Sequence, residues 1–152
     1  MGTGYPADTL HSCPEGALSE PHIHRVSVYY EDTDFSGLVY HANYLKYCER
    51  AREHILGRAA LVDLYRSSGT GFVVYKAELT FKEGAQFGDE LEVRTTVELK
   101  SDFRAVFHQD VYRVGGTTPM VLCEIHLVAV GPDNKLVKLP EGVISMARER
   151  FE

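Results

Sequence analysis

The sequence predicts one α+β domain, in which a curved antiparallel sheet of about five strands packs against a single long helix. Three observations favour this fold class: one amphipathic helical stripe, strand-like segments before and after it, and short turn signals between the later segments. The chain has 152 residues, 44% of them hydrophobic, which is enough for one core and too little for two domains of ordinary size.

The segment before the helix divides into a leader and a strand. Residues 1–20 mix Gly, Pro, Ser, Thr and acidic residues with little periodicity, so we expect a flexible leader and a folded domain at 21–152. Over residues 24–30, β-branched and aromatic side chains alternate with polar ones, which predicts a first strand. A turn-like segment at 31–37 should end this strand.

The helix is predicted from apolar residues that recur at intervals of three and four, with the charged residues largely off that stripe. The apolar residues are Tyr44, Cys48, Ala51 and Ile55. We expect the helix to end near Gly57 and a linker containing 67–71 to follow it.

Four further strands are predicted after the linker, at 72–81, 89–100, 103–114 and 120–130. The second of them alternates apolar and polar residues, so one of its faces should be buried and the other wet. Short turn signals separate the last three strands, which predicts that they pair antiparallel as a curved meander.

Composition and charge exclude several classes of protein. A net charge of −6 argues against a nucleic-acid partner, because such binding depends on Lys and Arg that neutralise phosphates. Three cysteines without a C-x-x-C pair fit a reducing cytoplasm, where we expect the protein to be located. The chain shows neither a signal-peptide pattern nor an apolar run that predicts a transmembrane segment.

The most informative segment is 29–44, which reads YYEDTDFSGLVYHANY. It places acidic residues, a glycine and a histidine between the first strand and the helix. A carboxylate held in a turn, followed by the free N–H groups of a helix start, forms a site for developing negative charge. This order of groups suits acyl transfer.

The pattern E-D-T-D-x-x-G-x-V-Y-H-x-x-Y, with E-R-A-R-E on the helix after it, resembles the YbgC-like acyl-CoA thioesterases. These belong to the 4-hydroxybenzoyl-CoA thioesterase group of hot-dog proteins, and the resemblance spans 24–140, strongest over 29–53. It implies a hot-dog fold, hydrolysis of acyl-CoA, active sites at the interface of a homodimer, and pairing of dimers into a homotetramer. It implies no cofactor and no metal.

The resemblance also implies catalytic roles. Asp34 matches the family's catalytic aspartate, as nucleophile or general base, although by residue type alone it would be a cap or turn residue. His41 falls at the expected helix start, where its N–H can polarise the thioester carbonyl. Tyr30 could donate a hydrogen bond to Asp34 or shape the pocket, and Asp32 should support the turn.

Five residues are candidates for substrate binding, by resemblance and by position. Gly37 allows close backbone approach or a positive φ, and Tyr40 lies beside His41. Phe72, Val73 and Val74 are candidates for the wall of an acyl pocket, although apolar strand residues belong to a core far more often.

Basic residues could meet the phosphates of CoA, although isolated basic residues are usually solvated. The candidates are Arg104, Lys135 and Lys138. The substrate could also be a thioester of acyl carrier protein, which the sequence does not distinguish from acyl-CoA.

Other chemistries fit the sequence less well. It contains no G-x-S-x-G, no Walker pattern and no complete dinucleotide motif, and Cys48 falls on the apolar stripe of the helix. The acids of 29–44 and the histidines before them have no established metal-ligand spacing, so we predict no metal and no cofactor. Two alternatives stay open: a hot-dog dehydratase or hydratase, and a non-catalytic module that binds acyl thioesters.

Overall fold

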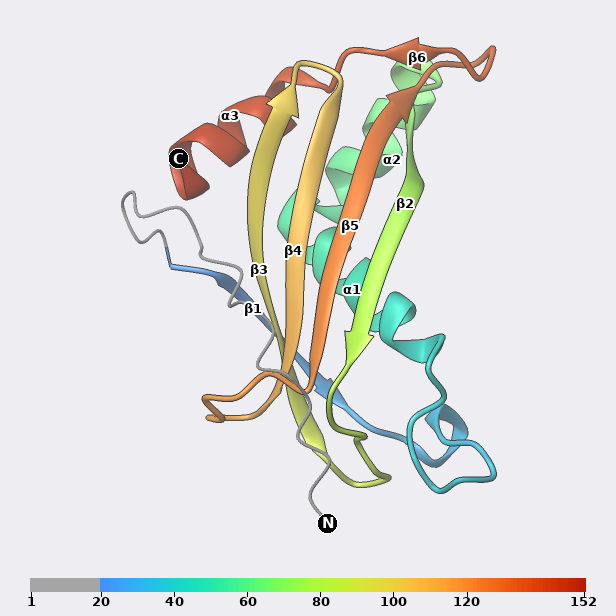
Figure 1. Ribbon diagram of the computed structural model, residues 1–152. Helices are drawn as coiled ribbons and strands as arrows, with labels where there is room; N and C mark the ends of the chain where they lie inside the picture. Colours follow the sequence, from blue (N-terminus) through green and yellow to red (C-terminus); the bar gives the residue numbers. More distant parts are fainter. Residues whose placement is uncertain (1–19) are drawn as a thin grey trace.

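The computed structural model describes residues 20–152, in which a six-stranded sheet curves around helix α1 (Figure 1). The leader predicted for 1–20 therefore lies almost wholly outside the described residues. In chain order the elements are β1 (His22–Ser27), the 3-10 turn η1 (Tyr30–Asp32), α1 (Asn43–Leu56), α2 (Arg58–Ser68), β2 (Gly71–Phe81), β3 (Glu90–Ser101), β4 (Arg104–Arg113), β5 (Val121–Val130), β6 (Leu136–Val137) and α3 (Glu141–Phe151).

The strands pair in the order β1-β3-β4-β5-β2, and every pair is antiparallel. Consecutive pairing of β3, β4 and β5 confirms the predicted meander, and β6 adds a short pair to the end of β5. The strand β2 follows the helices in sequence and pairs with β5, so it forms one edge of the sheet.

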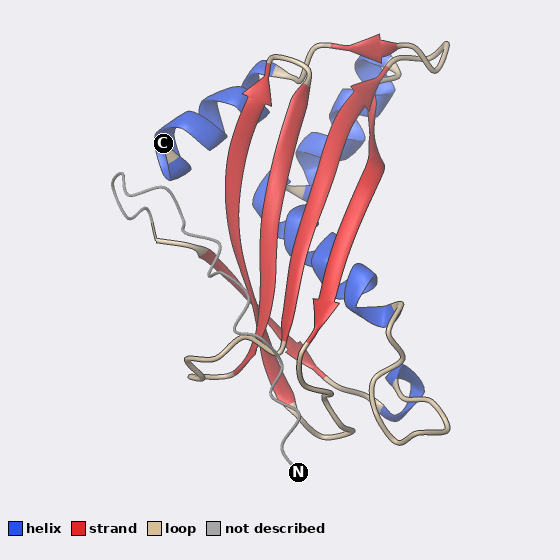
Figure 2. Ribbon diagram, in the orientation of Figure 1, coloured by secondary structure: helices blue, strands red, loops and turns tan. Residues whose placement is uncertain are grey.

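The core lies between the sheet and α1. Figure 2 shows α1 and α2 along one face of the sheet. The predicted helical stripe is confirmed at Tyr44, Cys48 and Ala51, which are almost fully buried, and β3 alternates as predicted, with Leu91 and Val93 buried. Burial of these apolar side chains supplies the main driving force that holds α1 in the curve of the sheet.

Two helices differ from the sequence expectation. The chain does end α1 before Gly57, whose φ of 87° is left-handed, but it then forms α2 where a linker was predicted. None of the side chains of α2 is fully buried, although Leu61 and Leu64 are partly buried on one face of the helix. The C-terminal helix α3 was not predicted, although Val143, Ile144 and Ala147 form its buried stripe.

The first strand is also shifted from its predicted range of 24–30. It ends at Ser27, and the residues after it enter the turn η1. The N–H of Tyr29 donates a 2.8 Å hydrogen bond to the carboxylate of Asp32, which draws the chain out of the extended conformation. Among residues 20–152 no helix is long and apolar enough to cross a membrane.

A buried polar network joins α1 to β4. The side-chain oxygen of Gln109 accepts a 2.8 Å hydrogen bond from Arg52, and its amide nitrogen donates to the backbone oxygen of Cys48 at 2.9 Å and to Thr95 Oγ1 at 3.2 Å. Burial lowers the pKa of the Arg52 guanidinium, which has no carboxylate partner within residues 20–152. Gln109 is therefore the group that satisfies this buried charge.

The substitution Gln109→Leu keeps the volume and removes the acceptor of Arg52. We expect the free energy of unfolding to fall by about 2–4 kcal/mol, measured by urea denaturation. Adding Arg52→Met should restore part of the loss, because the buried charge without a partner is then gone. An equal or larger loss in the double variant would contradict this role of Gln109.

Candidate active site

The candidate catalytic aspartate sits in a small hairpin between η1 and α1. Thr33 and Val39 form an antiparallel bridge at its base. The N–H of Asp34 donates to the backbone oxygen of Leu38, and the N–H of Gly37 donates to the backbone oxygen of Asp34, both at 3.0 Å. Gly37 has a φ of 81°, a left-handed conformation that strains other residues, so the turn itself requires glycine.

The carboxylate of Asp34 is solvent exposed and accepts two hydrogen bonds from Ser36. One comes from the Ser36 hydroxyl and the other from its backbone N–H at 2.8 Å. These two bonds, the hydroxyl first, lower the pKa of Asp34, and the charge of His41 lowers it further. Asp34 is therefore both a turn residue and a carboxylate that stays ionised into acid solution.

The turn is tied to the start of α1 through Asp32. Its backbone oxygen accepts hydrogen bonds from the N–H of Tyr40 and from the side-chain amide of Asn43, both at 2.8 Å. The Tyr47 phenol lies near Asp32, and burial, followed by the negative charge of Asp32, raises the pKa of this phenol. Asp32 thus has the supporting role predicted for it, and Asn43 is a residue that the sequence analysis missed.

The start of α1 presents free backbone donors. The N–H of Asn43 is bonded to the oxygen of Tyr40 at 2.8 Å. The N–H groups of His41, Ala42 and Tyr44, by contrast, have no hydrogen-bond acceptor within residues 20–152. Free amides at a helix start carry a partial positive charge and bind anionic oxygen atoms.

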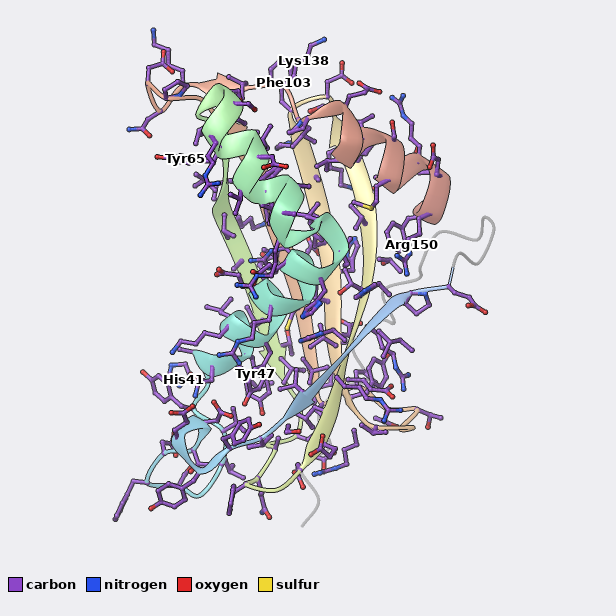
Figure 3. All side chains as sticks on the ribbon, turned by 180° about the vertical axis from the view of Figure 1, so that it is seen from behind. His41, Tyr47, Tyr65, Phe103, Lys138 and Arg150 are labelled. Atoms are coloured by element: carbon purple, nitrogen blue, oxygen red, sulfur yellow. The ribbon has the colours of Figure 1, made fainter. Side chains whose placement is uncertain are left out.

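Aromatic rings surround the helix start. The ring of His41 lies 4.4 Å from that of Tyr40 and 6.3 Å from that of Phe81, the last residue of β2. Phe81 also contacts the ring of Tyr44 at 5.8 Å. Figure 3 shows His41 at the N-terminal end of α1. The end of β2 is thus fixed next to the free amides.

Tyr30 is placed differently from the hypothesis of a hydrogen bond to Asp34. Its side chain is 78% exposed, and its ring meets the edge of Phe87 at 6.0 Å. Within residues 20–152 no hydrogen bond joins Tyr30 to Asp34. In the protomer, Tyr30 is therefore an exposed neighbour of the turn rather than a partner of the carboxylate.

The three candidate acyl-wall residues lie at the opposite end of β2 from His41. Phe72 and Val74 pair with Ala129 and Leu127 on the helix side of the sheet, whereas Val73 faces the other side. Phe72 and Phe81 are nine positions apart, which corresponds to about 30 Å along a strand. One protomer therefore does not bring Phe72 to Asp34.

The basic candidates also lie far from Asp34 or are already paired. Lys138 is at the end of the molecule opposite His41 (Figure 3) and lies 3.5 Å from Asp102. Lys135 lies 3.7 Å from Asp133. Arg104 is 3.4 Å from the hydroxyl of Tyr75. The protomer thus does not gather these residues into a phosphate site.

One group of potential metal ligands occurs among residues 20–152, on β2 and β5. Ligand atoms of Glu78, Glu124 and His126 lie within 4.8 Å of one another. Lys76 forms an ion pair with Glu78 at 3.1 Å, and His126 Nε2 lies 2.6 Å from a carboxylate oxygen of Glu124, so each of these groups already has a polar partner. None of them belongs to the Asp34 turn.

Comparison with known proteins shows the family of the chain. The family model of the thioesterase-like superfamily matches residues 28–145. The chain belongs to this superfamily. It is 44% identical over 89 residues to "Acyl-CoA thioesterase YbgC" of Helicobacter pylori, an alignment that covers 58% of this chain and 65% of that protein. This chain thus spans slightly less than two thirds of that relative.

Two longer matches support a YbgC-like member with the hot-dog fold. "Acyl-CoA thioester hydrolase YbgC" of Escherichia coli is 32% identical over 126 residues, covering 79% of this chain and 90% of that protein. The crystal structure of a probable thioesterase from Bartonella henselae superposes with a TM-score of 0.72 at 29% identity, covering 79% of this chain and 99% of that one. The predicted family and fold are confirmed.

Two residues of the candidate site escaped the sequence analysis. Ser36 holds the Asp34 carboxylate, and the spacing Asp-x-Ser is a signal for such a turn. Asn43 holds the backbone of Asp32, and an Asn at a helix start is a signal for a polar anchor. Both signals were present, but short polar patterns of this kind occur in many turns.

The substitution Ser36→Ala tests the origin of the lowered Asp34 pKa. Without the hydroxyl, the pKa should rise toward its ordinary value of 3.8, so that the carboxylate protonates at a higher pH. The ionised form of Asp34 stabilises the folded state above the unfolded-state pKa, and this stabilisation is lost as the pH falls through the folded-state pKa. In Ser36→Ala this contribution to stability becomes smaller. A carbon-13 titration of the Asp34 carboxyl group measures the shift.

The matched control is Ser67→Ala, which removes a hydroxyl that donates to the backbone oxygen of Leu64 on α2. It should leave the Asp34 titration unchanged. An unchanged pKa in Ser36→Ala would show that the hydroxyl does not hold the carboxylate.

Proposed function

We propose that the protein hydrolyses acyl-CoA thioesters to a free carboxylic acid and CoA. The observation that carries the proposal is the tie between an ionised Asp34 turn and the free N–H groups at the start of α1. Relatives named as acyl-CoA thioesterase and acyl-CoA thioester hydrolase support this choice of substrate.

In the proposed reaction, the thioester oxygen accepts hydrogen bonds from the amides near His41, which polarise the carbonyl. Asp34 then follows one of two routes. As a nucleophile it attacks the carbonyl carbon, expels the CoA thiolate and forms an anhydride that water hydrolyses. As a general base it takes a proton from a water molecule that attacks the same carbon. Both routes require the ionised carboxylate.

The substitution Asp34→Asn keeps the size of the side chain and removes its charge. We expect kcat to fall by about 10²–10⁴-fold, measured as thiol release from a panel of short, long and aromatic acyl-CoAs. Asp63→Asn is the matched control, because it makes the same change at an exposed position on α2. Equal turnover by wild type and Asp34→Asn would exclude the proposed role of Asp34.

The same assay separates the two alternative functions. A dehydratase or hydratase alters the acyl group and leaves the thioester intact, so mass spectrometry of the products would detect it without thiol release. A binding module would retain acyl-CoA without turnover. The proposed hydrolase releases thiol and free acid in equal amounts.

We also propose that the active unit is a homodimer in which two sheets join along β2. This strand has an unpaired edge within the described residues (Figure 1), and it exposes Val73, Val74 and Tyr75. Unpaired strand edges with apolar side chains favour pairing with another strand. Pairing of two dimers into a homotetramer is proposed on the family resemblance.

The edge pairing is testable with a charge on β2. Val74→Lys should convert dimers to monomers and lower thioesterase activity, because lysine on an edge disfavours strand pairing. Val114→Lys is the control, because Val114 comes directly after β4 and does not belong to β2. The two valines are similarly exposed, 43% for Val74 and 37% for Val114. Sedimentation equilibrium measures the mass. A dimer that survives Val74→Lys unchanged would contradict pairing along β2.

A cytoplasmic location is proposed as well. Cys48 and Cys123 are both buried and free, as expected for thiols in a reducing compartment.

A further inference from the structure

Three histidines from β1 and α1 form a group that the candidate active site does not use. The ring of His24 on β1 stacks on the ring of His54 in the last turn of α1, with the ring centroids 4.5 Å apart. His22 lies two positions before His24 and therefore on the same face of β1. On the neighbouring strand these two residues pair with Thr95 and Val93, which carry no charge. We call the three residues the histidine cluster.

Arginines from α1 and α3 lie close to the histidine cluster. Burial lowers the pKa of His22, and the charges of Arg150 and His54 lower it further. Burial also lowers the pKa of His24, followed by the charges of the other two histidines and of Arg50. Apart from burial, the groups that shift these two pKa values are therefore cationic.

Carboxylates do not neutralise these arginines within residues 20–152. Neither Arg50 nor Arg150 has a carboxylate partner there. On α1, Glu53 is already paired with an arginine of α2 at 2.8 Å. Glu49 and Glu149, which precede the two arginines in sequence, are exposed. In a chain with a net charge of −6, this end of the molecule thus gathers cationic groups that lack an anion.

One nitrogen of the histidine cluster is buried without a partner. Nδ1 of His22 forms no hydrogen bond with any group of the part of the chain that the structure describes. Glu20, two positions earlier, is exposed and does not bond it. A buried ring nitrogen without a hydrogen bond costs free energy, so a polar atom of a ligand would stabilise this arrangement.

The histidine cluster is separate from the candidate active site. It lies at β1, the edge of the main strand order opposite β2. His54 comes 13 positions after His41, which corresponds to about 20 Å along a helix. Figure 3 shows Arg150 on the other side of the molecule from His41. A small ligand at the cluster therefore does not contact the Asp34 turn of the same protomer.

On this basis we propose that the histidine cluster, together with Arg50 and Arg150, binds a dianionic phosphate group. Guanidinium groups and protonated imidazoles donate charge-assisted hydrogen bonds to phosphate oxygens. Burial and the arginines favour neutral rings in the empty site, whereas a bound dianion favours the protonated form. Binding should therefore take up protons and become stronger as the pH falls.

Sulfate is the first probe, because it stays a dianion between about pH 8 and pH 6, where a phosphate group takes up a proton. An NMR titration of the histidine ring signals gives both the dissociation constant and the ring pKa values. The affinity should rise about tenfold or more from the upper to the lower pH, and the pKa of His24 should rise in the sulfate-bound protein. An affinity independent of pH, or ring signals that do not saturate, would overturn the proposal.

Variants at exposed positions locate the site. Arg150→Gln removes a charge and His54→Gln removes a ring, and each should weaken sulfate binding at the lower pH about tenfold or more. The matched controls are Arg148→Gln, on another face of α3, and His108→Gln, whose ring lies 3.4 Å from Glu98 on the sheet. Both controls should bind sulfate as the wild type does. Equal affinity in all five proteins would mean an adventitious ion only.

The phosphate group could belong to a free phosphate compound or to the ribose of CoA. If CoA displaces sulfate better than dephospho-CoA does, and loses this advantage in Arg150→Gln, the site binds the ribose phosphate of CoA. If inorganic phosphate displaces sulfate and the two CoA forms do not differ, the site binds a free phosphate compound. Failure of both phosphate and CoA to displace sulfate would overturn the proposal. None of these measurements requires turnover, so the outcome is independent of the proposed hydrolase function.

Discussion

The backbone oxygen of Asp32 is the point on which the geometry of the site depends. It accepts one hydrogen bond from the backbone of Tyr40 and another from the buried amide of Asn43, the first residue of α1. These two bonds fix the Asp34 turn against the start of a helix whose stripe is packed in the curve of the sheet. The position of the carboxylate is therefore determined by the same core that stabilises the fold.

The charge of Asp34 depends on its hydrogen bonds with Ser36. In the protomer the carboxylate is exposed, and Ser36 lowers its pKa, so it is ionised but weakly basic.

Much of the fold was predictable because its signals are local. The alternation of β3 and the stripe of α1 follow from periodic burial, and Gly57 ends α1 as its residue type suggests. Helix α2 was missed because the Ser- and Gly-rich segment at its end favoured a linker, although Leu61 and Leu64 have a helical spacing. The turn at Asp34 was recognised through a motif rather than through its hydrogen bonds.

The apolar cavity beside α2 was less accessible to sequence reasoning. Phe72 and Val73 are adjacent in sequence, yet the strand turns them to opposite faces of the sheet, and only Phe72 lines the cavity. The cavity itself is formed by α1, α2, β2 and α3, which are far apart in the chain. The periodicity of a single segment does not predict that these four elements meet.

The most direct test of the account is a crystal structure of the Asp34→Asn variant with an acyl-CoA bound. The account predicts the thioester oxygen at about 2.7–3.1 Å from N–H groups at the start of α1, with the side chain of residue 34 facing the carbonyl carbon. A thioester bound away from residue 34, or an oxygen without contact to these amides, would contradict it.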